Sequence, residues 1–172
     1  NFLNILIMKA KPLFISLGIF SIYAFSLLAF AVWQIGPIPI LAWFTAGVIS
    51  YSLTEYIVHR YIFHIVAHSP KSRKFQYSIH GNHHEDPGAE TKVMMRPGYA
   101  IIALFIITLI FYFPLRINSL AFIPGFISGY GFYLFIHFAY HEYRPPKNFL
   151  RALWKHHYLH HHFCDSKNYG VS

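Results

Sequence analysis

Residues 55–64 read EYIVHRYIFH and residues 80–84 read HGNHH, and these two stretches decide how the chain is interpreted. Residues 38–54, which lead into the first stretch, are uncharged, so its histidines follow directly from an apolar segment. Neutral imidazole is a ligand for zinc, iron, copper and nickel. The two stretches therefore predict an apolar helix that ends in a metal site.

The same arrangement recurs later in the chain. His137 and His141 end another apolar segment, and residues 157–161 read HYLHH. In both copies sixteen positions separate the last histidine of the apolar segment from the first of the next cluster. A pattern repeated at one spacing favours a built site over compositional chance. Ten histidines are accordingly predicted as metal ligands and catalytic-site residues: His59, His64, His80, His83, His84, His137, His141, His157, His160 and His161.

Ten imidazoles are too many for one ion but suit two, each bound by four or five nitrogens, so the predicted centre is dinuclear. Residues at i, i+3 and i+4 share a helical face, so His80, His83 and His84 can point together. The alternative is that Gly81, which weakens a helix, marks a bend close to the metal. His59 and His64 are five apart and can converge only if the last turn of their helix is distorted. The remaining histidines, His68, His156 and His162, are interpreted as surface or supporting groups.

Composition predicts a membrane protein. Of the 172 residues, 55% are hydrophobic and 12% are charged, against about 25% charged in soluble domains. The net charge of +8 comes from basic residues at the ends of apolar segments, which is typical of topology signals and argues against nucleic-acid binding. A single cysteine, Cys164, excludes an internal disulfide and a cysteine-based zinc motif.

Four apolar segments are long enough to cross a bilayer as helices. The predicted spans are residues 13–33, 38–58, 97–115 and 117–140, joined by short links into two hairpins. The predicted fold is therefore an all-α integral membrane protein whose single domain covers residues 1–172. Residues 59–96 and 141–172 are expected to form a helical cap that holds the histidines.

Two helices are expected within this cap. Ser69-Pro70 predicts the start of the first, with serine as N-cap and proline in the first turn. The second is expected to run from Lys147 to about His162, after Pro145-Pro146.

Orientation follows from the lysines and arginines. With four spans, 13 of these 14 residues fall on one side and only Arg116 falls on the other. The positive-inside rule then places both termini and all four histidine clusters on the cytoplasmic face.

Four motifs resemble the fatty acid hydroxylase and sterol desaturase superfamily, and most of all its fatty acid 2-hydroxylase branch. They are Glu55-Tyr56-x-x-His59-Arg60-Tyr61-x-Phe63-His64, His80-Gly81-x-His83-His84-x-x-Pro87, His137-x-x-x-His141 and His157-x-x-His160-His161. The resemblance implies a multi-pass membrane monooxygenase that uses O2 and two iron ions, with zinc possible in a purified sample. It implies hydroxylation at C2 of a fatty acyl chain, with electrons from a separate donor such as a cytochrome b5 or ferredoxin system.

Two other interpretations are open at this stage. A carotenoid or sterol hydroxylase or desaturase of the same superfamily would use the same histidines. A membrane metal transporter would belong to a different class, but its ligands should lie along a path near the middle of the membrane, whereas these histidines collect at one end of the spans.

Overall fold

The computed structural model describes residues 2–85, 97–163, 167 and 169–170, and all the regular structure among them is helical. Pro87 and Cys164 of the sequence analysis lie outside the described residues. The chain forms two compact units. The first, here the hairpin unit, comprises Asn1–Tyr51 and Met94–Phe132, and the second, the histidine unit, comprises Ser52–Val93 and Tyr133–Ser172.

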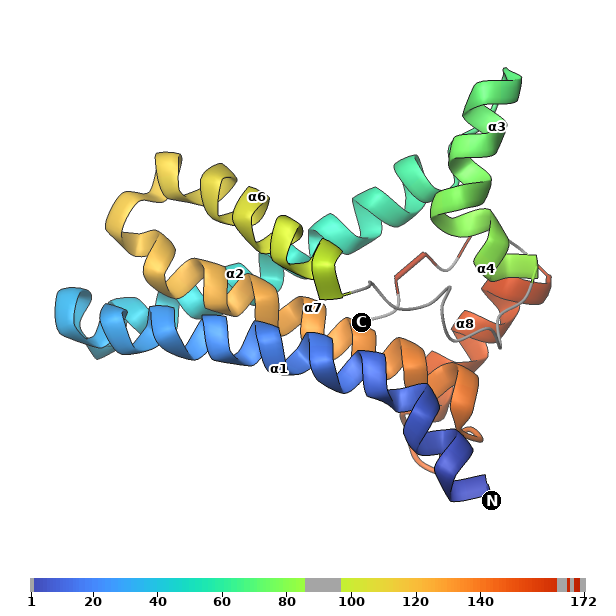
Figure 1. Ribbon diagram of the computed structural model, residues 1–172, viewed down its shortest axis with the longest axis horizontal. Coiled ribbons are helices and arrows are strands. Elements are labelled where there is room, and N and C mark those ends of the chain that lie inside the picture. The colour runs from blue at the N-terminus through green and yellow to red at the C-terminus, as the bar shows by residue number, and fades with distance from the viewer. Residues whose placement is uncertain (1, 86–96, 164–166, 168, 171–172) are drawn as a thin grey trace. The chain divides into compact units, whose positions relative to one another are not determined.

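The hairpin unit is built from long apolar helices that reverse direction over very short links. Helices α1 (Phe2–Ile35) and α2 (Pro37–Val58) are separated by Gly36 alone, and α6 (Pro97–Leu115) and α7 (Ser119–Glu142) by the short 3-10 helix η3 (Arg116–Asn118). Figure 1 shows the chain reversing between α6 and α7. Gly36 has φ of 75°, which glycine adopts without a steric penalty.

Arg116 provides the corresponding reversal between α6 and α7 with a φ of 53°, an uncommon value for a residue with a side chain. The hydroxyl of Ser119 donates a hydrogen bond of 2.6 Å to the carbonyl oxygen of Arg116. The α6–η3–α7 turn is therefore held by a local polar contact.

One face of α1 supplies much of the packing in the hairpin unit. Its buried residues recur at helical spacing: Ala10, Leu13, Ser16, Phe20, Ala24 and Ala31. The ring of Phe20 packs against that of Tyr130 in α7 at 5.3 Å. The hydroxyl groups of Tyr23 and Thr108 join α1 to α6.

Two glycines let α2 and α7 cross backbone to backbone. A β-carbon at Gly47 would overlap the carbonyl oxygen of Phe122, and one at Gly125 would overlap that of Phe44. Small residues allow this close approach between apolar helices. The crossing therefore depends on the absence of side chains at these two positions.

Three stretches are long and apolar enough to cross a membrane: Ala10–Ile35, Pro37–Phe63 and Gly98–Glu142. The first two contain the predicted spans 13–33 and 38–58, and the third contains α6, η3 and α7 apart from Pro97. Many apolar side chains on these helices are exposed, including Phe25 at 72%. Such an apolar surface is unusual for a soluble protein. Because all the regular structure of the described residues is helical, the all-helical prediction is confirmed.

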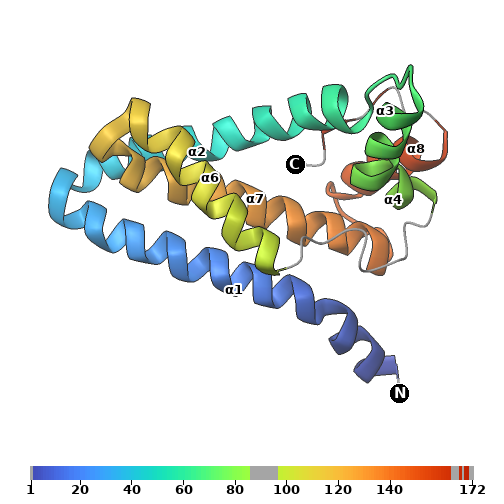
Figure 2. The ribbon, with the colours of Figure 1, turned by 45° about the horizontal axis from the view of Figure 1, so that its top comes forward.

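The histidine unit contains the short elements that follow α2 and α7. They are the π-helical turn η1 (His59–Phe63), α3 (Pro70–Gln76), the π-helical turn η2 (Tyr77–Gly81), α4 (Asn82–Glu85) and α8 (Arg151–His162). Figure 2 shows α3, α4 and α8 gathered beside the ends of α2 and α7 that belong to this unit.

The Ser69 cap is confirmed: Ser69 and Ser72 form a reciprocal capping box, and Pro70 occupies the first turn. The predicted start of the second helix at Lys147 is wrong, because α8 begins at Arg151. Asn148 explains the difference, since its side-chain oxygen accepts the N–H of Leu150 at 3.1 Å and stabilises a turn before the helix.

The Gly125→Ala substitution should destabilise the protein by about 1–3 kcal/mol or more, because the added methyl group forces α2 and α7 apart. The matched control is Gly18→Ala, since no atom lies within 4 Å of a β-carbon at Gly18. Thermal unfolding of both variants in detergent, followed by circular dichroism, tests this. Equal midpoints for the two variants would contradict the close crossing.

Candidate metal centre

Histidine nitrogens converge in two groups of five. Within each group one ligand atom per residue can be chosen so that all five lie within 4.8 Å of one another. Group A comprises His59, His64, His80, His84 and His160, and group B comprises His83, His137, His141, His157 and His161. These are the ten histidines predicted from the sequence, brought together within the histidine unit. His68, His156 and His162 are exposed and belong to neither group.

The π-helical turn η1 aligns two members of group A. Five residues of a regular α-helix rotate a side chain by about 140°, which would turn His59 and His64 apart. In η1 the N–H of His64 instead donates to the carbonyl of His59 at 3.2 Å, the i to i+5 bond of a π-helix. The two rings lie 5.1 Å apart as a result.

Each H-x-x-H-H motif divides its histidines between the two groups. His80 and His84, four residues apart, join group A, whereas His83 joins group B. The prediction that all three point together is wrong, because side chains at i+3 and i+4 are rotated by about 100° from each other.

The second H-x-x-H-H motif divides in the same way but with the groups exchanged. His157 and His161, four residues apart, join group B, and His160 joins group A. The groups are in contact, since the rings of His84 and His161 stack at 4.3 Å. Each of these two short helical segments therefore contributes histidines to both groups.

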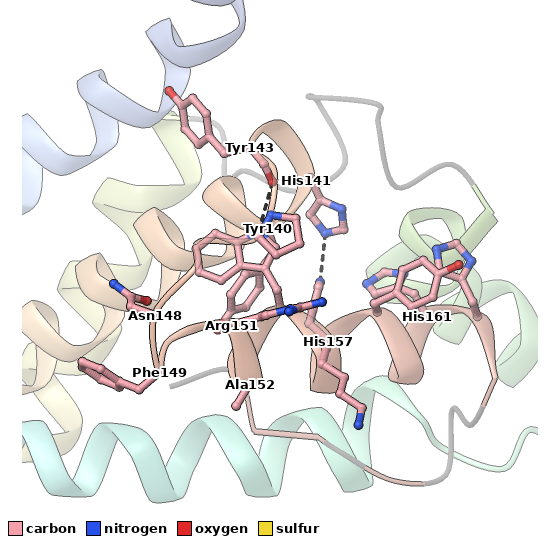
Figure 3. Close-up of a pocket in the computed structure, with 14 residues that line it drawn as sticks. Tyr140, His141, Tyr143, Asn148, Phe149, Arg151, Ala152, His157 and His161 are labelled. Carbon is pink, nitrogen blue, oxygen red and sulfur yellow. Dashed lines mark hydrogen bonds between the residues drawn. The ribbon is translucent and has the colours of Figure 1, made fainter.

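The nitrogen spacing fits metal coordination. Two ligands at right angles around an ion, each about 2.1 Å from it, lie about 3.0 Å apart. In group A the Nε2 atoms of His80 and His59 are 3.0 Å apart, and those of His80 and His84 are 2.9 Å apart. In group B the Nε2 atoms of His141 and His157 are 3.0 Å apart, as the dashed line in Figure 3 shows.

Unpartnered nitrogens support the same conclusion. Among the described residues, Nδ1 of His137, Nδ1 of His157 and both ring nitrogens of His161 are buried without a hydrogen-bond partner. Each such group costs about 1–3 kcal/mol. An ion bound by group B would give a partner to one nitrogen of His161, and the converging nitrogens of the group can hold such an ion.

Burial keeps the imidazoles neutral. The pKa of His80, of His157 and of His161 lies well below the usual value, first because burial removes water from the charged form. Repulsion from neighbouring imidazoles lowers each pKa further. At neutral pH these three rings therefore keep the lone pairs that a metal ion requires.

Backbone groups near the C-terminal end support group A, and nothing in the sequence signals their role. The carbonyl of Lys167 lies 2.8 Å from Nδ1 of His160 and can only accept, so Nδ1 carries the proton and Nε2 is left as the metal-binding atom. The backbone of Tyr169 hydrogen-bonds His59. The Tyr169 ring packs edge-on against His59, His64 and His160 at 5.3–5.8 Å between centroids.

Fold and site together define an all-helical protein with candidate membrane-spanning helices and two polyhistidine groups able to hold metal ions. The chain belongs to the fatty acid hydroxylase family, whose model matches residues 44–172. The family expected from the histidine motifs is thereby confirmed.

Characterised relatives share this family. The chain is 29% identical over 127 residues to a dihydroceramide fatty acyl 2-hydroxylase of Arabidopsis thaliana, covering 73% of this chain and 54% of the relative. It is 30% identical to a ceramide very long chain fatty acid hydroxylase of Schizosaccharomyces pombe, covering 77% and 39%. It is 28% identical to the fatty acid 2-hydroxylase of Homo sapiens, covering 75% and 36%. The chain thus spans about half or less of these relatives.

A solved structure has the same fold. The structure of full-length scs7p, in which only the hydroxylase domain is visible, matches with a TM-score of 0.77 and 26% identity. The match covers 87% of this chain and 58% of that one.

The His157→Ala substitution should lower the metal content of the purified protein from two ions per chain to one or fewer, because it removes a buried donor from group B. His156→Ala is the matched control, since His156 is the adjacent residue of the same helix and is exposed. Elemental analysis by mass spectrometry measures both. Equal metal content in the two variants would contradict the assignment of His157 to a metal site.

Proposed function

We propose that this chain is the hydroxylase part of a dinuclear iron monooxygenase that inserts a hydroxyl group at C2 of a fatty acyl chain. The observation that carries the proposal is the pair of five-nitrogen groups, each with Nε2 atoms 2.9–3.1 Å apart. The family and the names of the relatives support lipid hydroxylation as the reaction. The overall reaction consumes O2, two electrons and two protons, and yields the hydroxylated lipid and water.

The roles proposed for the protein's own residues follow from the site. Two iron ions held by groups A and B would supply the activation of O2. The ten histidines would hold the ions, and the carbonyl of Lys167 fixes the tautomer of His160. His83, His137 and His160 are exposed to 3% or less, which shields these three ligands from water. Electrons come from a separate donor such as a cytochrome b5 or ferredoxin system.

The proposed membrane arrangement has four spans in two hairpins, with both termini and the metal centre on the cytoplasmic face. If the 45 residues Gly98–Glu142 formed one continuous helix, it would be about 68 Å long, which is about twice the thickness of a bilayer core. In the hairpin unit the chain reverses at η3, and Phe111 of α6 packs against Phe122 and Phe126 of α7. Both observations support two crossings within this stretch.

Cysteine labelling tests the topology. The only cysteine, Cys164, should react with a membrane-impermeant maleimide from the cytoplasmic side. In the double variant Asn118→Cys, Cys164→Ser, labelling should occur only from the opposite side, because Asn118 lies in the link between α6 and α7. Labelling of both sites from the same side would exclude the four-span arrangement.

Isotope labelling tests the reaction. Membranes that contain the chain and a supplied electron donor should convert acyl lipids to 2-hydroxyacyl products that retain label from ¹⁸O₂, detected by mass spectrometry. His83→Ala should reduce the product at least a hundredfold, whereas His68→Ala, which alters an exposed histidine outside both groups, should retain it.

Other outcomes of this experiment would identify a different function. A new double bond without label would indicate a desaturase, and a labelled carotenoid or sterol would indicate another branch of the superfamily. Metal flux into vesicles without any lipid product would indicate a transporter. Each of these would overturn the proposal.

A further inference from the structure

A pocket of about 950 Å³ lies in the histidine unit beside α8, and Figure 3 shows it. His141, His157 and His161 of group B line it together with residues of the 143–149 segment and of α8. This volume lies within the range of ligand-binding pockets and far exceeds that of O2. The pocket therefore gives a molecule larger than O2 access to the ligands of group B.

The charged side chains that line the pocket are all cationic. Among its 14 lining residues only Arg151 and Lys155 are charged at neutral pH with histidines neutral, and none is an aspartate or glutamate. The two are four residues apart in α8 and so share a helical face. Among the described residues that line the pocket, a negative group would meet two cations and no like charge.

Aromatic side chains form the rest of the wall. The indole N–H of Trp154 donates to the carbonyl of Tyr143 at 3.0 Å, and its ring packs edge-on against Tyr140 at 4.7 Å. Phe149, 85% exposed, and Tyr143, 50% exposed, extend this apolar wall to the surface. The pocket thus offers an apolar side and a cationic side, which suits an amphiphile with an anionic end.

We infer that this pocket binds the carboxylate end of a free fatty acid, with Arg151 and Lys155 as its counter-charges. The inference rests on the proposed function, because C2 is bonded directly to the carboxyl carbon, about 1.5 Å away. Hydroxylation at C2 therefore requires the carboxyl group to lie beside the metal-binding histidines. Arg151 can bind both carboxylate oxygens, which Lys155 cannot.

A binding experiment tests the pocket without requiring catalysis. In a Trp33→Phe, Trp43→Phe background, Trp154 is the only tryptophan, and its fluorescence reports a nitroxide that binds nearby. The probes are 5-doxyl-stearic acid and its uncharged methyl ester. Replacing Arg151 and Lys155 together by Gln should raise the half-quenching concentration of the acid at least tenfold and that of the ester less than twofold.

The matched control for charge is Lys147→Gln, since Lys147 is exposed, lies four residues before Arg151 and does not line the pocket. It should leave both half-quenching concentrations unchanged. An equal effect of the double substitution on acid and ester, or an equal effect of Lys147→Gln, would overturn the assignment. A carboxylate effect confined to Arg151 and Lys155 would support it.

Turnover separates this inference from the proposed function. The wild type should hydroxylate a free fatty acid at C2, and the double variant should lose at least tenfold in kcat/KM for it. If the wild type hydroxylates only ceramide or another neutral acyl lipid, the pocket inference fails and the proposed function stands. If it hydroxylates no lipid while the acid still binds selectively, the proposed function fails and the carboxylate site remains.

Discussion

The histidine unit depends on the convergence of ten imidazoles. Nitrogens 2.9–3.1 Å apart can share a proton between two rings, but a second positive charge at that distance would be strongly repelled. Burial and mutual repulsion therefore select the neutral form, which is also the form that binds metal. The unpartnered ring nitrogens of His161 show that hydrogen bonds between the rings do not satisfy every nitrogen of this unit, and both groups are able to hold metal ions.

Convergence on this scale requires departures from regular helix geometry. The π-helical turns η1 and η2 each end next to or within a histidine motif. A π-helical turn adds one residue to the repeat, so side chains five apart come to lie on one face. Such turns are poorer hydrogen-bonding arrangements than α-helix. They persist here because the rings that they align, such as those of His59 and His64, pack against other imidazoles and against the ring of Tyr169.

The sequence predicted the helices closely, because long apolar runs and strong stop signals leave few alternatives. Helix α6 has the predicted bounds of 97–115, and Ser69 caps its helix as expected. The ten histidines that converge were likewise identifiable from their repeated spacing. The division of each H-x-x-H-H motif between two groups was not, since it depends on where neighbouring helices lie. The backbone hydrogen bonds of Lys167 to His160 and of Tyr169 to His59 could not be predicted either, because every residue has the same backbone groups.

Because each H-x-x-H-H motif contributes histidines to both groups, the positions of groups A and B are coupled. The segment around α4 supplies His80 and His84 to group A and His83 to group B, and α8 supplies His160 to group A and two histidines to group B. A shift of either segment therefore moves ligands of both groups at once. If each group instead drew its ligands from separate helices, one ion could be lost without disturbing the other. The interlocked arrangement therefore couples the positions of the two groups through the short helices that contribute to both.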